Sequence, residues 1–245
     1  MKIVGVIPAR FASTRFPAKV VASISGKPMI EHVYTRAKQC QQLEDVLIAC
    51  DHEYVLKVAK DFGANVVMTN PNHPSGSDRV AEAIKDLDVD IIVNIQGDEP
   101  FIDPKTIDSL AILLRNDPQC LMGTVIKEIS DDKDFQNPNV VKCVVDSQGY
   151  ALYFSRSPIP YNRNVIRPMD SKQYKHIGLY AYRKNFLLQY KDWPKSVLET
   201  TEQLEQLRVL EKGYRIKTVV TTMESVSVDT PEDLRKAEQW YDQSR

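Results

Sequence analysis

Short apolar runs alternate with amphipathic segments in the first half of the chain, and this alternation most constrains the fold. Fully apolar runs of a few residues are typical of strands buried on both faces, whereas the longer segments between them are typical of helices that cover a sheet. The expected strands are 3–7, 46–50, 66–68 and 91–95, and the expected helices are 28–41, 54–62, 77–87 and 104–115. The pattern predicts parallel strands with helices on both faces.

The second half of the chain has a different pattern. Apolar runs at 140–145 and 150–154 flank a Ser-Gln-Gly turn and predict a hairpin. Expected next are a strand at 176–182, helices near 184–190 and 199–212, a strand at 216–221 and a helix that Thr230 would cap. The whole pattern predicts an α/β fold with a mixed, mostly parallel central sheet flanked by helices. Because no linker or repeat divides the chain, we expect a single domain over 1–245 with an inserted subdomain at roughly 126–200.

A segment rich in cations follows the first expected strand. Residues 8–19 read PARFASTRFPAK and carry Arg10, Arg15 and Lys19 but no acidic residue, although the net charge of the chain is −1. Ligands of parallel sheets bind at the carboxyl ends of the strands, where this segment lies. A small polyanion suits such a local positive field better than nucleic acid, which needs a longer basic stripe. A solvated basic surface is the alternative explanation.

The sequence lacks the common glycine-rich phosphate loops. It has nine glycines and neither a GxxxxGK[ST] nor a GxGxxG motif. Side chains would then have to bind phosphate, with bidentate contacts from Arg and a point charge from Lys. The three cations of the opening segment therefore fit a triphosphate or a pyrophosphate.

A second strand end carries a carboxylate. Gln96-Gly97-Asp98 directly follows the expected strand at 91–95, and the glycine permits close approach of other groups. Mg²⁺ is typically bound by one or two protein carboxylates together with phosphate oxygens. The alternative is a plain turn that caps a helix, but the position opposite the cationic segment favours a metal ligand.

Cysteine spacing and hydropathy indicate the compartment. The four cysteines are far apart, with no CxxC pair and no nearby His at metal-ligand spacing, so reduced thiols are expected. No segment approaches the roughly 20 apolar residues needed to cross a membrane. No signal peptide is visible before the first expected strand. We expect a cytoplasmic protein that binds neither a membrane nor nucleic acid.

Nine short motifs occur in order along nearly the whole chain. They are IPAR (7–10), STR (13–15), GKPMI (26–30), SGSDR (75–79), NIQGDEP (94–100), YALYFSR (150–156), HIG (176–178), LEQLR (204–208) and VDTPED (228–233). Together they resemble the 3-deoxy-manno-octulosonate cytidylyltransferases, or CMP-Kdo synthetases, where Kdo is the eight-carbon acid sugar. The resemblance is specific because it rests on all nine motifs in order and not on any one of them.

The resemblance implies a fold like that of nucleotide-diphospho-sugar transferases and a cytoplasmic, Mg²⁺-dependent, usually dimeric enzyme. Such an enzyme joins CTP to Kdo and releases pyrophosphate and CMP-Kdo for lipopolysaccharide synthesis. The CTP phosphates would contact Arg10, Arg15 and Lys19, and the nucleotide pocket would include Ser75, Gly76, Arg79 and Gln96. Asp98 and Asp229 would bind Mg²⁺, and Arg156, His176, Tyr180, Glu205 and Gln206 would face the sugar. Arg10, Lys19, Asp98 and Asp229 would be the catalytic residues.

One position departs from the family pattern. The loop of the family usually reads Arg-x-Pro-Gly-Lys, and here Ala18 replaces the glycine. If that position requires a positive φ, the loop is strained or shaped differently, and the reach of Lys19 changes.

Several alternatives stay open at this level. His176 could be a structural histidine, Glu205 could pair with Arg208 three residues on along one helix, and Asp229 could simply start a helix. The substrate could be the 8-amino analogue of Kdo or another acid sugar. The chain could also be a glycosyltransferase, another sugar nucleotidyltransferase, or a nucleotide-binding regulator without turnover, although two metal-binding aspartates argue against the regulator.

Overall fold

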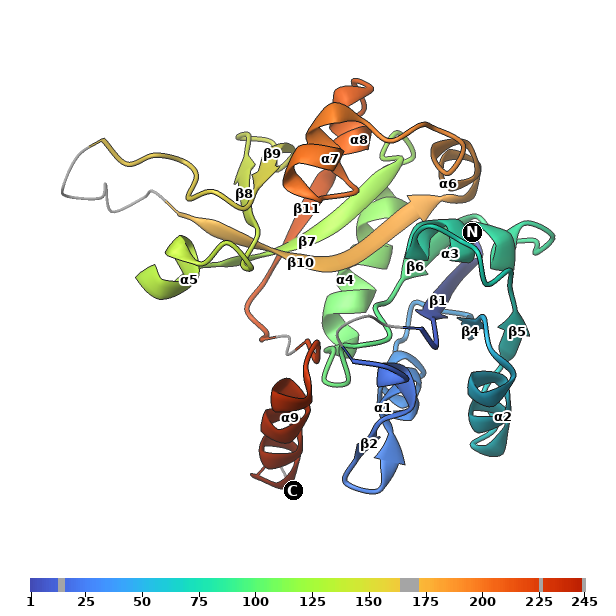
Figure 1. Ribbon diagram of the computed structural model, residues 1–245. Coiled ribbons are helices and arrows are strands. Elements are labelled where there is room, and N and C mark those ends of the chain that lie inside the picture. The colour runs from blue at the N-terminus through green and yellow to red at the C-terminus, as the bar shows by residue number, and fades with distance from the viewer. Residues whose placement is uncertain (13–15, 164–171, 225–226, 244–245) are drawn as a thin grey trace.

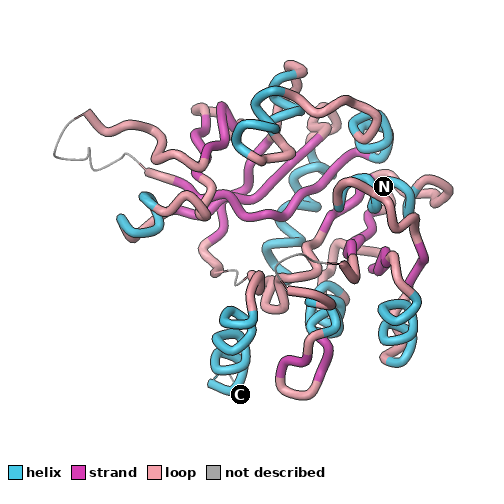
Figure 2. Tube along the Cα trace, viewed as in Figure 1, coloured by secondary structure: helices cyan, strands magenta, loops and turns pink. Residues whose placement is uncertain are grey.

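A central sheet with helices on both sides forms the body of the molecule in the computed structural model (Figure 1). The structure describes all residues except 13–15, 164–171, 225–226 and 244–245. Among the described residues, nine strands belong to this sheet, and seven of them follow the order β11-β7-β10-β6-β1-β4-β5. Figure 2 shows the helices distributed on both sides of these strands.

The first half of the chain supplies a parallel block. β1 pairs in parallel with β4 and β6, and β4 pairs in parallel with β5. The strands are β1 (Ile3–Ala9), β4 (Asp45–Cys50), β5 (Val66–Met68) and β6 (Ile91–Asn94), and the helices are α1 (Met29–Ala37), α2 (Glu53–Asp61), α3 (Gly76–Ile84) and α4 (Pro104–Asn116). The predicted alternation is confirmed, with ends that differ by a few residues.

The second half makes the sheet mixed. β10 (Tyr174–Arg183) is antiparallel to both β6 and β7 (Met122–Glu128), and β11 (Lys217–Thr221) is parallel to β7. The predicted hairpin consists of β8 (Lys142–Val145) and β9 (Ala151–Ser155), and β8 also pairs with β10. The mixed, mostly parallel sheet is therefore confirmed. The remaining elements are η1 (Lys19–Val21), β2 (Ser23–Ile24), β3 (Lys27–Pro28), α5 (Asp132–Gln136), α6 (Lys184–Tyr190), α7 (Val197–Glu202), α8 (Leu207–Glu211) and α9 (Pro231–Gln243).

Each face of the sheet packs on its own hydrophobic core. On β1, Ile3 and Ile7 belong to the core that α1, α2 and α4 cover, whereas Val4 and Val6 belong to the core beneath α3, α6 and α8. A strand buried on both faces has to be apolar at every position, which explains its unbroken apolar run. Burial of such side chains contributes roughly 25 cal/mol per Å² of apolar surface. The carboxyl end of β1, where the cationic segment begins, is thus rigidly anchored.

The predicted helix at 199–212 is wrong because the structure has two helices there. Residues 203–206 separate α7 from α8, and α7 ends at Gln203, whose φ of 54° lies in the left-handed region that ends a helix. Glu205 lies in this connection, so the alternative in which it pairs with Arg208 along one helix does not apply. Arg208 instead donates to Glu199 at 2.7 Å, as part of a buried ion pair.

The start of the last helix is as predicted. The hydroxyl oxygen of Thr230 accepts the backbone N–H of Asp233 at 3.2 Å, and the Asp233 carboxylate accepts the Thr230 N–H at 3.0 Å. This reciprocal pair satisfies donors that a helix start leaves unpaired. Thr230 and Asp233 therefore cap α9, and the Asp229 side chain is directed elsewhere.

The structure also bears on the expected state of the cysteines and on the expected lack of a membrane span. The four cysteines are free, and burial raises the pKa of Cys143 to about 12, as expected of an inert thiol. Within the described part of the chain, no helix is both long and apolar enough to span a bilayer. The inserted subdomain at roughly 126–200 stays a prediction.

Candidate active site

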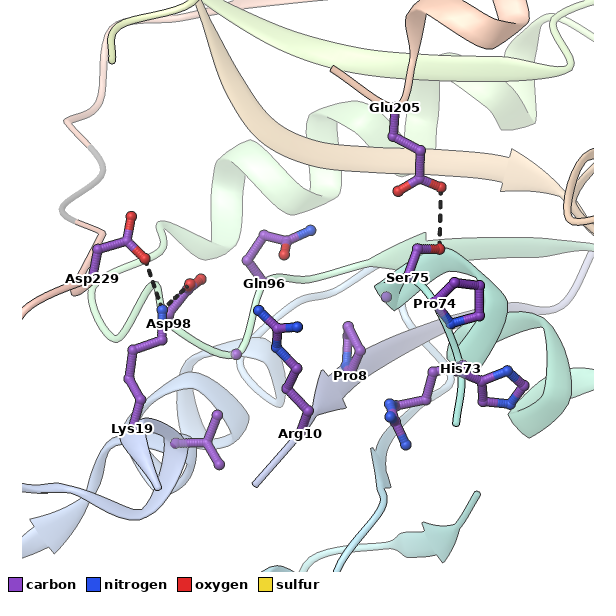
Figure 3. A pocket seen from close by; sticks show the side chains of 14 residues that line it. Pro8, Arg10, Lys19, His73, Pro74, Ser75, Gln96, Asp98, Glu205 and Asp229 are labelled. Atoms are coloured by element: carbon purple, nitrogen blue, oxygen red, sulfur yellow. Dashed lines mark hydrogen bonds and ion pairs between the residues drawn. The ribbon is translucent and has the colours of Figure 1, made fainter. Parts of the chain in front are cut away.

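The ends of β1 and β6 and the start of α3 surround a pocket (Figure 3). Pro8 and Arg10 come from the end of β1, Gln96 and Asp98 follow β6, and Ser75 precedes α3. A Cβ atom at Gly97 would lie 2.9 Å from the Pro8 carbonyl oxygen, so only glycine lets the two strand ends approach this closely. The predicted meeting of strand ends is therefore confirmed.

Lys19 joins the two predicted metal ligands. Its Nζ atom donates to Asp98 at 2.7 Å and to Asp229 at 2.9 Å, although the aspartates are far apart in sequence. The N–H of Val228 donates to the Asp98 carbonyl oxygen at 2.9 Å, which attaches the chain before α9 to the end of β6. Burial lowers the pKa of Lys19, but the charges and hydrogen bonds of Asp98 and Asp229 outweigh burial and raise that pKa overall.

The two carboxylates fit a cation site. Like charges held this close repel unless a cation lies between them, and here the Lys19 ammonium group supplies it. Among the described residues, no group of three or more His, Cys, Asp or Glu side chains could hold a metal ion. Two carboxylates suffice for Mg²⁺ when phosphate oxygens and water complete its shell, so Asp98 and Asp229 are the candidate ligands.

Ala18, which stands where the family usually has glycine, does adopt a positive φ. Its φ of 56° and ψ of 24° lie in the left-handed region, directly before η1. The Ala18 N–H donates to the Phe11 carbonyl at 3.1 Å, and its carbonyl accepts from the Val21 N–H at 3.0 Å. The loop therefore keeps the conformation that favours glycine, and Lys19 still reaches both carboxylates.

Replacing Ala18 with Gly is expected to raise the free energy of unfolding by up to about 1 kcal/mol, because it removes left-handed strain from a residue with a Cβ atom. Urea unfolding measures the change. Ala22→Gly is the matched control, since Ala22 is extended at φ −61° and glycine there should destabilise by about 0.5–1 kcal/mol. Equal destabilisation by both substitutions would contradict strain at Ala18.

Arg10 is the cation that the pocket leaves most accessible. Its side chain is exposed and extends toward Gln96, and no ion pair joins it to another described residue (Figure 3). A guanidinium group in this state can bind phosphate oxygens without first breaking an internal contact. Arg15, the other predicted phosphate contact, lies outside the described residues.

Arg79 lines the pocket but is already engaged. Its guanidinium donates to Asp51 at 2.9 Å and to the Thr69 hydroxyl at 2.6 Å, and both carboxylate and guanidinium are buried. Asp51 also accepts the N–H of Phe11 at 2.8 Å, which fixes the start of the cationic loop. The position of Asp51 at the end of an expected strand predicts that its segment meets those of Arg10 and Gln96–Asp98, but no role in the site was assigned to Asp51 from the sequence.

The start of α3 forms another wall. Ser75 caps this helix by accepting the Asp78 N–H at 3.2 Å, and Gly76 is its first residue. The Ser75 hydroxyl has one hydrogen to donate and lies 2.6 Å from the Asp78 carboxylate and 3.4 Å from the Glu205 carboxylate across the pocket (Figure 3). The predicted nucleotide-pocket residues Ser75, Gly76, Arg79 and Gln96 thus line one cavity, and Arg10 and Lys19 line it as well.

A second pocket adjoins the first. It is lined by His176, Gly178 and Tyr180 of β10, by Glu205 and Gln206 after α7, and by residues 139–141. Four residues line both pockets, namely Gln96, Asp98, Glu205 and Asp229. The candidate metal ligands therefore stand at the junction, where groups bound in the two pockets would meet.

His176 is held as a neutral side chain. Burial lowers its pKa to about 3, and its Nε2 atom lies 2.8 Å from the Thr124 hydroxyl. Because that hydroxyl donates its hydrogen to the Leu179 carbonyl at 2.9 Å, Nε2 carries the proton in the contact with Thr124. Nδ1 is then an acceptor. His176 can accept a hydrogen bond from a hydroxyl group, but its lowered pKa makes it a weak base.

Glu205 and Gln206 supply opposite hydrogen-bonding groups. The Glu205 carboxylate accepts from the Tyr190 hydroxyl at 3.0 Å, and burial raises its pKa. The Gln206 side chain is only 3% exposed, and its Nε2 atom has no hydrogen-bond partner among the described residues. An unpaired buried donor is costly, so it indicates that a ligand acceptor belongs beside it.

Tyr180 and Arg156 differ from each other in placement. Tyr180 lies in the second pocket with its ring centre 5.3 Å from that of His176, as expected. Arg156 lines neither pocket, because its guanidinium donates to the main-chain carbonyls of Glu202 at 2.7 Å and Pro138 at 3.1 Å. The prediction that Arg156 faces the sugar is not met by this conformation.

The fold and the paired pockets define a nucleotide-binding transferase, and a family model described as cytidylyltransferase matches residues 4–219. A CMP:2-keto-3-deoxy-manno-octonic acid synthetase, solved in complex with CTP, has a TM-score of 0.95 and 40% identity, and the match covers 100% of both chains. A 3-deoxy-manno-octulosonate cytidylyltransferase of Solibacter usitatus is 52% identical, over 98% of this chain and 94% of that protein. A namesake from Geotalea daltonii is 49% identical over 96% of each chain. This chain belongs to the 3-deoxy-manno-octulosonate cytidylyltransferase family.

Proposed function

We propose that this protein joins CTP to Kdo, releasing pyrophosphate and CMP-Kdo for lipopolysaccharide synthesis. The main support is the pair of adjoining pockets, both of which Asp98 and Asp229 line. One pocket presents Arg10 and Lys19 to a polyanion, and the other is lined by Gln206, whose buried Nε2 donor has no partner among the described residues. A triphosphate and an acid sugar match these two sets of groups.

The reaction is an in-line attack of the sugar's anomeric hydroxyl on the α-phosphorus of CTP. An O–P bond forms, the bond to the pyrophosphate oxygen breaks, and the hydroxyl proton leaves to solvent. Two anions have to approach each other, so Arg10 and Lys19 act by reducing the repulsion and by orienting the phosphates. No protein base is assigned, since His176 is a weak acceptor of protons at its depressed pKa.

Asp98 and Asp229 would hold Mg²⁺. When bound, this ion would supply positive charge to the phosphate oxygens at the junction. Lys19 contacts both carboxylates in the structure, so its ammonium group would have to share them with the ion or move toward the phosphates.

A homodimer and a cytoplasmic location complete the proposal. Both follow from the family resemblance, and four free cysteines suit a reducing compartment. Sedimentation of the purified protein tests the dimer, and fractionation of cells tests the location.

Pyrophosphate release tests the reaction directly. Each of the four ribonucleoside triphosphates is incubated with the protein and Mg²⁺, with and without Kdo. We expect release only with CTP plus Kdo. Release without an acid sugar, or none with CTP and Kdo, would overturn the proposal, and parallel reactions with 8-amino-Kdo show which sugar is preferred.

Substitution in the second pocket should separate the two substrates. His176→Ala and Glu205→Ala are each expected to raise the KM for Kdo by about tenfold, because each loses a hydrogen bond to the sugar, with a smaller change in the KM for CTP. Steady-state kinetics with one substrate varied at a time measures both constants. A larger effect on CTP than on Kdo would mean that the sugar pocket is misplaced.

A further inference from the structure

Lys142 is a fully buried lysine on β8. Its side chain has 0% exposure, and no carboxylate of the described residues forms an ion pair with it. Its Nζ atom donates instead to two main-chain carbonyls, those of Asn137 at 2.9 Å and Val140 at 2.6 Å. Burial lowers its pKa, which reflects the cost of keeping an ammonium group from water. The fold therefore maintains these two contacts at an energetic cost.

Of the two carbonyls that Lys142 holds, that of Val140 belongs to a residue lining the second pocket, and that of Asn137 lies two residues before this lining begins. Asn139, Val140 and Val141 line that pocket next to His176. The loop is also fixed internally, since the Val140 N–H donates to the Asn137 carbonyl at 3.0 Å. Beyond the loop, the Val141 carbonyl accepts the His176 N–H at 2.8 Å. A shift of residues 137–141 would therefore move the backbone of His176.

Arg156, directly after β9, connects this loop to the segment that follows α7. Besides Pro138, its guanidinium donates to the carbonyls of Glu202 at 2.7 Å and Gln203 at 3.4 Å. The chain then continues into Glu205 and Gln206, which line the second pocket. Lys142 and Arg156 thus hold main-chain carbonyls in or next to two segments that line one pocket, 139–141 and 203–206.

We propose that Lys142 is a positioning residue for the acid-sugar pocket, which it holds in shape together with Arg156 through main-chain carbonyls of 137–140 and 202–203. This inference rests on the proposed function for the identity of the sugar. The hydrogen bonds also direct those carbonyl oxygens to the two cations, so they do not repel a sugar carboxylate. Neither cation has to contact the substrate.

Lys142→Met in the full-length protein tests the proposal, because methionine keeps the length and removes the donors. We expect a KM for Kdo raised by about tenfold, with the KM for CTP changed by less than about twofold. Lys184→Met is the matched control, since Lys184 donates to the Leu87 carbonyl at 2.5 Å and lines neither pocket. Both KM values should stay unchanged in the control.

Hydrogen exchange on the wild-type protein gives a second test that does not need a folded variant. We expect Kdo, but not CTP, to slow exchange of the amides in 137–142 and 203–206. Equal changes of both KM values, a lower melting temperature with an unchanged KM for Kdo, or no Kdo-dependent protection would overturn the inference. Failure of the wild type to release pyrophosphate from CTP and Kdo would overturn the proposed function instead.

Discussion

Asp98→Asn and Asp229→Asn are each expected to lower turnover by about 10²-fold or more while the protein stays folded, because metal-assisted charge stabilisation contributes several kcal/mol to the transition state. Asparagine keeps the shape of the side chain but removes the charge that a divalent cation needs. Pyrophosphate release at saturating CTP and Kdo measures turnover, and circular dichroism checks the fold. In the wild type, a chelator should abolish activity and Mg²⁺ should restore it.

The structure makes Asp229→Asn the sharper of the two tests. If Asp229 only helped to start α9, asparagine could replace it at little cost. Thr230 and Asp233 already form that cap, so the structure leaves the Asp229 carboxylate for another role. Asp103→Asn is the matched control, since Asp103 caps α4 by accepting the Thr106 N–H at 2.9 Å and lies outside both pockets. Full Mg²⁺-dependent activity in Asp229→Asn would contradict the shared metal site.

The parallel half of the fold could be predicted because its signals are local. A strand buried on both faces has to be apolar throughout, as β1 is, and the loops that follow such strands meet at one edge of the sheet. The role of Gly97 could be predicted for the same reason, since a glycine between a strand and a carboxylate indicates that other groups approach the backbone closely there. The nucleotide side of the site followed from these rules together with the family resemblance.

The sugar side was harder to predict because it depends on tertiary contacts. Nothing in the local sequence indicates that Gln203 adopts a left-handed conformation, so one helix was expected where there are two, and Glu205 was placed on a helix. β7 was not predicted, although it pairs with both β10 and β11. A buried lysine such as Lys142 cannot be distinguished from an exposed one by its neighbours in sequence, because its partners are carbonyl groups.

Arg10→Ala and Lys19→Met should each lower turnover by about 10²-fold or more, on the scale seen when an electrostatic stabiliser of a transition state is removed. The reasons differ between the two. Arg10 has no ion pair with another described residue, so its loss should act mainly through the phosphates and raise the KM for CTP as well. Lys19 shares Asp98 and Asp229 with the proposed ion, so its loss should leave two carboxylates that repel each other until a cation binds.

Lys19→Met therefore carries a second expected result, which concerns metal affinity. Because the ammonium group and Mg²⁺ compete for the same carboxylates, the Mg²⁺ concentration for half-maximal residual activity should fall or stay the same, even though turnover is lost. Lys27→Ala is the matched control from the same basic stretch, since Lys27 pairs with Glu31 at 2.8 Å and lies outside both pockets. Its kinetic constants should match those of the wild type. Near-normal turnover in both Arg10→Ala and Lys19→Met would mean that the opening loop is only a solvated basic surface. A higher Mg²⁺ requirement in Lys19→Met would show that the ammonium group supports binding of the ion rather than competing with it.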